Sequence, residues 1–236
     1  MDAKKYSDKV LPNQEFFRYL YRDGIQFESA LYALLAEYGG KFDSSQFKLT
    51  TPKGTDFEQM STPPWQLVLF DAIIALTGTK TVLEIGTFIG HSTMQFARMT
   101  GEGGHVTTIE VGKEFADIAR ENFKRNGFEK RITLLQGDAG AALDQLSPNS
   151  FDLVFVDGSK QDYLEYTLKA EKLLTSHGVI IVDDVFFHGD ALNKEPTTEK
   201  GRGCKDLLDY FKANDRFKKL LLPVANGILI LFKDRS

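Results

Sequence analysis

The chain has 236 residues, a formal net charge of -4, and 42% hydrophobic and 26% charged residues. These values are ordinary for a soluble globular protein, and the length suffices for one large domain with a full core. A net negative charge argues against nonspecific nucleic-acid binding, which needs a basic face. No apolar run approaches the ~20 residues that span a bilayer, so no membrane association is expected.

Two features bear on where the protein works. The first ten residues are polar and charged, without the apolar core of a signal peptide. Cys204 has no second cysteine with which to form an internal disulfide, so nothing indicates an oxidising compartment. The sequence therefore predicts a cytoplasmic protein.

The first 60 residues are expected to be a helical extension followed by a loop. Residues 14–21 and 25–38 carry aromatic and aliphatic stripes at helical spacing. Residues 41–60 are polar and interrupted by Gly and Pro, which predicts a loop or lid with little regular structure. Pro63-Pro64 then begins a helix, since proline is tolerated in a first turn. We expect one domain over residues 1–236, in which this extension joins a core at 61–236.

From residue 80 onward, short apolar runs alternate with amphipathic stretches, which predicts βαβ units and a parallel sheet. The expected strands are residues 82–86, 106–110, 132–138, 153–157 and 179–184. The expected helices are residues 91–99, 113–126, 139–146, 162–174 and 203–213. Two further runs, 217–222 and 228–232, flank Asn226-Gly227 and predict a terminal antiparallel hairpin.

Acidic residues lie at or near the end of each of the five parallel strands. They are Glu84, Glu110, Asp138, Asp157 and the pair Asp183-Asp184. In an open α/β sheet, ligands bind outside the carboxyl ends of the strands, where the strand order reverses. These carboxylates are therefore expected to converge on one rim. Such a rim suits a cationic or hydroxyl-rich ligand, or a metal, and disfavours phosphates.

The turn after the first strand contains a glycine loop. Gly86 permits a tight turn and a close approach of ligand to backbone, and Gly90 permits close helix packing. A dinucleotide-binding loop would carry a second glycine where this chain has Phe88, to make room for a pyrophosphate. The loop therefore fits an adenosine ligand without a diphosphate, and it disfavours a dehydrogenase.

Two strand-end acids are candidates for contact with that ligand. Glu110 lies 26 residues after Glu84, near the spacing of an acid that binds ribose hydroxyls. A carboxylate can accept from both hydroxyls at once. The alternative is that Glu110 caps a helix N-terminus. Asp138 is expected to face the adenine edge, and it could cap the following helix at the same time.

Three segments resemble a known family. Residues 83–93, LEIGTFIGHST, resemble the first motif of class I S-adenosylmethionine methyltransferases. Residues 151–163, FDLVFVDGSKQDY, and 178–189, GVIIVDDVFFHG, narrow the resemblance. Together they resemble the cation-dependent O-methyltransferases typified by the catechol and caffeoyl-CoA enzymes. The resemblance covers about residues 60–233.

The resemblance implies a Rossmann-like α/β fold, with a seven-stranded, mostly parallel sheet in the order 3-2-1-4-5-7-6 and helices on both faces. It implies S-adenosylmethionine as the cofactor, S-adenosylhomocysteine as the product, and a homodimer as the assembly. The candidate cofactor-binding residues are Met60, Glu84, Gly86, Thr87, Phe88, Ser92, Glu110, Val111, Asp138, Ala139 and Asp157.

The resemblance also implies a divalent cation, usually Mg²⁺, on Asp157, Asp183 and Asp184. Relatives commonly carry Asn where this chain has Asp184, so the chain has one more negative charge there. Three nearby carboxylates raise one another's pKa values and repel, and a dication resolves that conflict. The alternative is that Asp183 and Asp184 only cap a loop.

Lys160 and Asp157 are the candidate catalytic residues. In the expected reaction, a vicinal diol of a small aromatic acceptor binds the cation, and Lys160 takes the hydroxyl proton. The alternative for Lys160 is a solvated lysine at a helix start. Trp65, Phe186 and Phe187 are candidates for an aromatic substrate wall, or they serve only in packing.

Two other functions remain open from the sequence. One is a methyltransferase that has lost its dependence on a metal, and the other is an S-adenosylmethionine-binding protein without catalysis. Lys160 and the three carboxylates argue against the second.

Overall fold

The computed structural model describes residues 37, 42, 44–55, 57–224 and 226–233. The helices expected at 14–21 and 25–38 lie outside the described residues, apart from Glu37, which is helical. The homodimer stays a prediction. Among the described helices, none has both the length and the apolar character that a membrane span requires.

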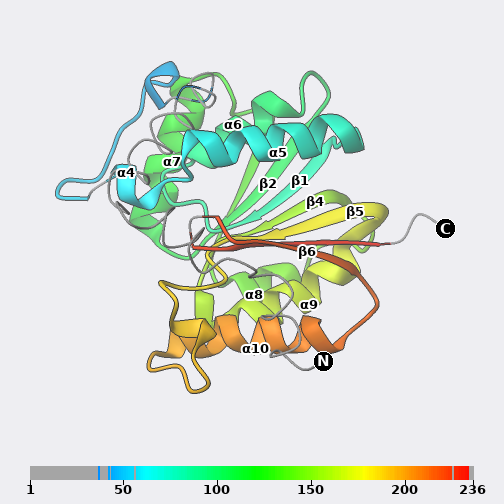
Figure 1. The fold of residues 1–236 in the computed structure, drawn as a ribbon. Helices are drawn as coiled ribbons and strands as arrows, with labels where there is room; N and C mark the ends of the chain where they lie inside the picture. The colour runs from blue at the N-terminus through cyan, green and yellow to red at the C-terminus, as the bar shows by residue number, and fades with distance from the viewer. Residues whose placement is uncertain (1–36, 38–41, 43, 56, 225, 234–236) are drawn as a thin grey trace.

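One seven-stranded sheet forms the centre of the molecule, in the order β3-β2-β1-β4-β5-β7-β6 (Figure 1). Its parallel strands are β1 (Thr81–Ile85), β2 (His105–Glu110), β3 (Ile132–Gln136), β4 (Phe151–Val156) and β5 (Leu174–Val182). β7 (Ile228–Phe232) runs antiparallel to both β5 and β6 (Lys218–Leu222). The predicted strand order and the terminal hairpin are confirmed.

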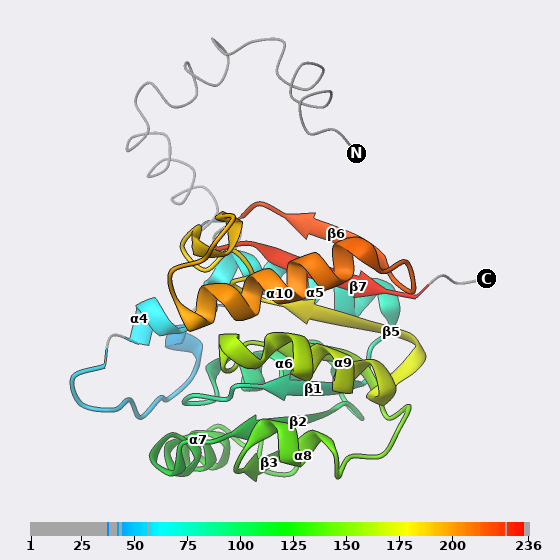
Figure 2. The same ribbon diagram turned by 90° about the horizontal axis from the view of Figure 1, so that it is seen from below.

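Helices cover both faces of the sheet, as Figures 1 and 2 show. One layer contains α5 (Pro64–Thr77), α6 (His91–Met99) and α7 (Lys113–Arg125). The other contains α8 (Ala139–Leu143), α9 (Tyr163–Leu173) and α10 (Glu199–Ala213). This arrangement is the Rossmann-like α/β fold that the resemblance implied.

The core is divided by the sheet into two apolar clusters. Leu67, Phe70, Met94, Phe96 and Phe123 pack from α5, α6 and α7. Leu143, Tyr163, Tyr166, Leu207 and Phe211 pack from α8, α9 and α10. Because the central strands are buried on both faces, their sequences are apolar throughout rather than alternating. β6 differs, since it forms the edge of the sheet and its residues are mostly exposed.

Two elements begin earlier than the sequence predicts. α10 begins at Glu199 rather than residue 203, because the Thr198 hydroxyl accepts from the Gly201 amide as an N-cap. β5 begins at Leu174 rather than residue 179, because Leu174 pairs with Phe151 before an irregularity in the register. The polar residues 175–178 conceal that start in the sequence.

The described residues of the segment 42–60, namely 42, 44–55 and 57–60, contain little regular structure, as expected. Their short elements are η2 (Ser44–Gln46) and α4 (Phe57–Met60). Phe42 and Phe47 are nevertheless buried in the α5–α7 side of the core. The segment is therefore packed against the domain although it has few backbone hydrogen bonds of its own.

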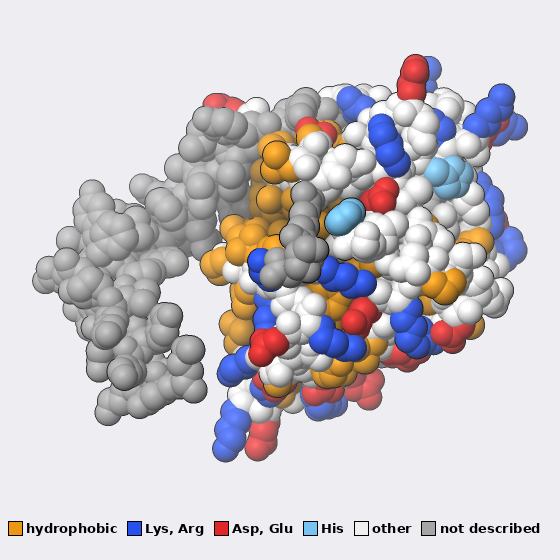
Figure 3. All heavy atoms as spheres, turned by 90° about the vertical axis from the view of Figure 1, so that its right-hand side faces the viewer, with side chains coloured by type: hydrophobic (Ala, Val, Ile, Leu, Met, Phe, Trp, Pro, Cys, Tyr) orange, Lys and Arg blue, Asp and Glu red, His pale blue; other side chains and the backbone are white. Residues whose placement is uncertain are grey.

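The site lies where the strand order reverses, between the carboxyl ends of β1 and β4. Gly86 follows β1 with φ +103, and a Cβ there would collide with the Asp157 carbonyl oxygen. The Gly86 amide donates to Ile109 O at 3.0 Å, and the Asp157 amide donates to Ile85 O at 2.9 Å. Figure 3 shows the other end of the molecule, where acidic and basic side chains are interspersed.

Candidate functional site

The glycine loop is connected to the end of β2 through Glu110. The Phe88 amide donates to Glu110 Oε2 at 2.8 Å, and the Gly112 amide donates to Oε1 at 2.8 Å. Phe88 has φ +51, so the loop turns sharply where a dinucleotide loop has glycine. The N-cap of α7 is Gly112, which excludes the N-cap alternative for Glu110. Both carboxylate oxygens are held by backbone amides and each keeps a lone pair for a ligand hydroxyl.

Glu84 lies beneath this loop and is fully buried. Its Oε1 accepts from Ser92 Oγ at 2.6 Å, and its Oε2 accepts from Thr108 Oγ1 at 2.7 Å and from the Thr93 hydroxyl. Burial raises the pKa of Glu84 to about 7, against the lowering effect of these three hydroxyl groups. Glu84 and Ser92, both candidates for cofactor contact, are thus bonded to each other.

Of the other cofactor candidates, Thr87 follows β1, Val111 follows β2, Asp138 follows β3, and Met60 ends α4. Asp138 caps α8, with Oδ1 accepting from the Ala141 amide at 2.8 Å, so its capping role is confirmed. Thr87 is buried, and its hydroxyl lies 2.6 Å from that of Thr108. Val111 is 71% exposed and Met60, at the end of α4, is 54% exposed. Their exposure leaves their surfaces available to a ligand.

Lys160 lies between two of the three predicted metal-binding carboxylates. Its Nζ is 3.2 Å from Asp157 Oδ1, 3.1 Å from Asp184 Oδ2 and 3.1 Å from Tyr163 Oη. Asp183 is bonded elsewhere, since its Oδ2 accepts from Gln66 Nε2 at 2.6 Å and its Oδ1 accepts from the Asp184 amide at 2.8 Å. Within the described part of the chain, no three His, Cys, Asp or Glu side chains are gathered as metal ligands.

The electrostatics of this group nevertheless indicate an excess of negative charge. Burial, together with the Asp157 and Asp184 carboxylates, raises the pKa of Asp183 to about 8. Burial also raises the pKa of Asp157, although the Lys160 ammonium opposes that shift. Burial lowers the pKa of Lys160, but Asp157 and Asp184 together raise it above its ordinary value. One ammonium therefore pairs with two carboxylates, Asp157 and Asp184, and the third, Asp183, has no cation among its contacts with the described residues.

Three neighbours of this group come from elements far away in the sequence. Gln66 reaches Asp183 from α5, and nothing in the sequence marks that pairing. Cys204 of α10 is buried and its thiol contacts Asp184 O at 3.8 Å, so it packs against this group. Gly203 lets α10 approach, because a Cβ there would collide with the Lys160 carbonyl. Asp184 has φ +55, a conformation that Asp tolerates better than most residues.

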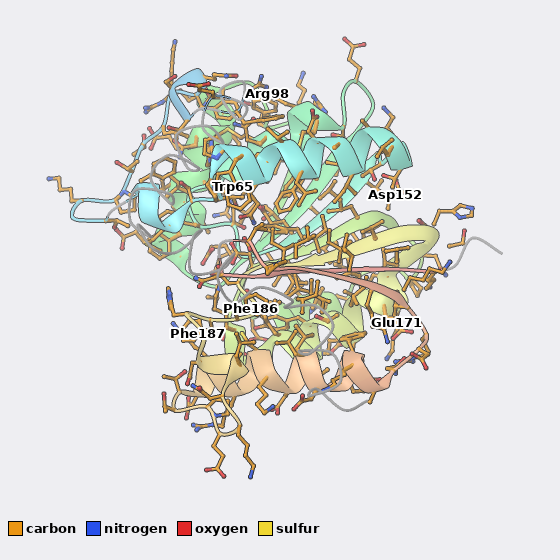
Figure 4. The ribbon with its side chains drawn as sticks, in the orientation of Figure 1. Trp65, Arg98, Asp152, Glu171, Phe186 and Phe187 are labelled. Atoms are coloured by element: carbon orange, nitrogen blue, oxygen red, sulfur yellow. The ribbon has the colours of Figure 1, made fainter. Side chains whose placement is uncertain are left out.

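The candidate aromatic residues lie at this same end of the molecule. Figure 4 shows Trp65 at the start of α5 and Phe186 and Phe187 beyond β5. The Phe186 amide donates to Asn226 O at 2.7 Å, which connects this segment to the turn before β7. Asp152, by contrast, lies at the opposite end, where it accepts from the Thr81 amide at 3.0 Å.

This chain is similar in sequence to known O-methyltransferases. The profile of the O-methyltransferase family matches residues 43–234. "Probable caffeoyl-CoA O-methyltransferase 2" of Dictyostelium discoideum is 27% identical over 220 residues, which cover 90% of this chain and 95% of that protein.

Solved structures of O-methyltransferases are also similar to this chain. The Bacillus cereus O-methyltransferase, in complex with SAH, is 25% identical with a TM-score of 0.69, covering 97% of this chain and 96% of the other. TomG of Streptomyces achromogenes, in complex with SAM, has the same identity and TM-score and covers 75% of this chain and 83% of its own.

The buried Glu84 predicts a specific dependence of stability on pH. Its folded-state pKa of about 7 exceeds the ordinary 4.5, so the folded protein binds more protons between these values. The stability that Glu84 contributes is present below pH 4.5 and is lost as pH rises through 7. The difference in unfolding free energy between Glu84→Gln and the wild type should therefore change with pH. It should move in favour of the variant by on the order of 3 kcal/mol as the pH rises from 4.5 to 8.

Urea unfolding of both proteins across this pH range measures the difference directly. Other carboxylates with shifted pKa values are present in both proteins, so their contribution largely cancels. A stability difference that stays constant with pH would contradict a raised pKa at Glu84.

Proposed function

Because the chain belongs to the O-methyltransferase family, we propose that it transfers the methyl group of S-adenosylmethionine to a hydroxyl of a small acceptor, with the help of a divalent cation. The observation that carries the proposal is the adjacency of two sites. Gly86 and Asp157 are in backbone contact, so the glycine loop and the Asp157–Lys160 group share one rim.

The cofactor half of the site supports an adenosine ligand without a diphosphate. Phe88 takes the position where a pyrophosphate-binding loop has glycine, and its amide is already used by Glu110. Glu110 is oriented by two backbone amides, so it can accept from ribose hydroxyls without a rearrangement. Solved relatives bound to SAM and to SAH support the same ligand here.

The chemistry of Asp157, Asp183 and Asp184 suits a hard dication, because all three groups offer carboxylate oxygens, although these side chains are not gathered as metal ligands in the described part of the chain. When bound, such an ion would lower the pKa of a hydroxyl placed beside it. Gln66 would act as the partner that orients Asp183, as residues around metal ligands do. Lys160 is the competing charge, since its ammonium now lies between Asp157 and Asp184.

Lys160 is the group that we propose takes the acceptor proton. The acceptor O–H bond breaks toward neutral Lys160, an O–C bond forms to the transferred methyl group, and the S–C bond breaks to release S-adenosylhomocysteine. Neutral Lys160 is favoured once the charge of Asp157 and Asp184 is compensated, because those carboxylates are what raise its pKa. Tyr163 and Asp157 hold its Nζ in place.

The acceptor that we propose is a small aromatic compound with adjacent hydroxyls. Trp65, Phe186 and Phe187 lie at the same end of the molecule and offer aromatic surface. The Phe187 ring lies 5.2 Å from that of His188, and Lys200 Nζ lies 5.8 Å from its centre. The caffeoyl-CoA name of a relative supports an aromatic acceptor.

Chelation tests the cation. Methyl transfer from S-adenosylmethionine to a catechol probe should disappear with EDTA and return with Mg²⁺. Calorimetry of S-adenosylhomocysteine in EDTA is the control, because cofactor binding should persist. Unchanged activity in EDTA would leave a cation-independent enzyme, and cofactor binding without transfer to any hydroxylated probe would favour a protein without catalysis.

Lys160→Ala should lower kcat by roughly 10²–10⁴-fold, because a positioned proton acceptor is lost. Affinity for S-adenosylhomocysteine should change less than twofold. Lys219→Ala is the matched control, since Lys219 pairs with Asp215 on the edge strand β6, away from the site. An unaltered kcat in Lys160→Ala would remove the role that we propose for this residue.

Glu110→Ala should weaken binding of S-adenosylhomocysteine by about 1.5–3 kcal/mol, because charge-assisted bonds to the ribose are lost. Isothermal titration calorimetry measures the change. Glu114→Ala, in the first turn of α7, is the control for the loss of a nearby carboxylate. Equal affinities of the Glu110 variant and the wild type would contradict the ribose contact.

A further inference from the structure

Asn122 of α7 and Asn126, which caps the C-terminus of that helix, bind the backbone of residues 48–50 as a neighbouring strand would. Asn122 Oδ1 accepts from the Thr50 amide at 2.7 Å, and its Nδ2 donates to Thr50 O at 3.1 Å. Asn126 binds Lys48 in the same way, at 2.9 and 3.1 Å. Asn122 and Asn126 are four residues apart, so they lie on the same side of the helix, and Lys48 and Thr50 are two residues apart, so they lie on the same side of an extended chain. Each asparagine can therefore meet one of these two residues.

Asn122 differs from Asn126 in one respect, because it also binds the glycine loop. Its Nδ2 donates to Ile89 O at 3.0 Å, and its side chain is fully buried. The next residue, Phe123, packs against Gly90 so closely that a Cβ at residue 90 would collide with its ring. Asn126 Nδ2 instead donates its other hydrogen bond to Asn122 O, within the same helix end.

The segment held in this way leads to α4, and we call residues 44–55 together with α4 the cover segment. Figure 1 shows it in blue and cyan at the same side of the molecule as α7. Phe47 and Phe57 both meet the ring of His91, at 5.9 and 5.5 Å, directly after Gly90. The cover segment therefore touches the glycine loop region at its beginning and at its end.

We propose that Asn122 is a positioning residue of the cofactor site, which couples the cover segment to the glycine loop so that a cofactor bound by the loop also fixes the cover. This inference rests on the proposed function, since it assumes that the loop binds S-adenosylmethionine. The amide has two N–H donors and uses them on Thr50 O and Ile89 O, one on each side. No simple carboxylate or apolar side chain can make both bonds.

Asn122→Asp and Asn126→Asp form a matched pair for the test. Each adds one negative charge to the same face of α7, and each removes the donor to the cover segment. Only the first removes the bond to Ile89 and turns an acceptor toward its carbonyl. Thr50→Pro is a third variant, which leaves the sequence of α7 unchanged and removes two donors of Thr50, its amide to Asn122 and its hydroxyl to Glu121.

Calorimetry with S-adenosylhomocysteine and hydrogen exchange with and without it are the measurements. Asn122→Asp should lose at least tenfold in affinity, while Asn126→Asp should lose less than threefold. In the wild type, the ligand should slow exchange of the amides of residues 48–60, and in Asn122→Asp it should not. The KM for the acceptor at saturating cofactor should stay within twofold in both. Thr50→Pro should also lose affinity for S-adenosylhomocysteine. If Asn122→Asp does not fold, the affinity of Thr50→Pro tests the coupling in its place.

The outcomes separate the inference from the function on which it rests. A wild-type protein that binds no S-adenosylhomocysteine overturns the proposed function. A wild type that binds, with Asn122→Asp and Thr50→Pro both within threefold of it, overturns the coupling. Equal losses in Asn122→Asp and Asn126→Asp also overturn it, because the bond to Ile89 would then have no effect of its own.

Discussion

The backbone contact between Gly86 and Asp157 is the constraint on which the rest of the site depends. Any side chain at residue 86 would collide with the Asp157 carbonyl, so the loops after β1 and β4 meet only because glycine lies there. The same contact places the glycine loop, held by Glu110, beside Asp157 and Lys160. A methyl donor and an acceptor hydroxyl need that adjacency, because alignment of the reacting atoms is the main contribution an enzyme makes to such a transfer.

Buried charge is the second feature that organises this rim. Asp157, Asp183 and Asp184 lie near one another with Lys160 as their counter-charge, and the raised pKa values of Asp157 and Asp183 express the remaining imbalance. Such an arrangement costs stability unless further positive charge arrives. Glu84 is a different case, because three hydroxyl groups satisfy its carboxylate within the protein.

Agreement between sequence and structure varies with the range of the interaction. Strands β1 to β4 and helix α6 have bounds close to those expected, because apolar runs and amphipathic spacing are local signals. The start of α10 was missed, since Gly201 and Gly203 look unfavourable for a helix until their close packing on Asp190 and Lys160 is known. The contacts of Gln66 and Asn122 were missed as well, because they join residues 117 and 72 positions apart.

The sequence by itself determined the class of the fold, the acidic rim and the absence of a pyrophosphate loop, because each follows from residue types at short spacing. It also contained the motifs of the O-methyltransferase family. Only the tertiary structure decided which groups each acid meets: hydroxyls for Glu84, backbone amides for Glu110, Lys160 for Asp157 and Asp184, and Gln66 for Asp183. The pairings of Gln66 with Asp183 and of Lys160 with Asp184 join distant parts of the chain, and no local pattern encodes them.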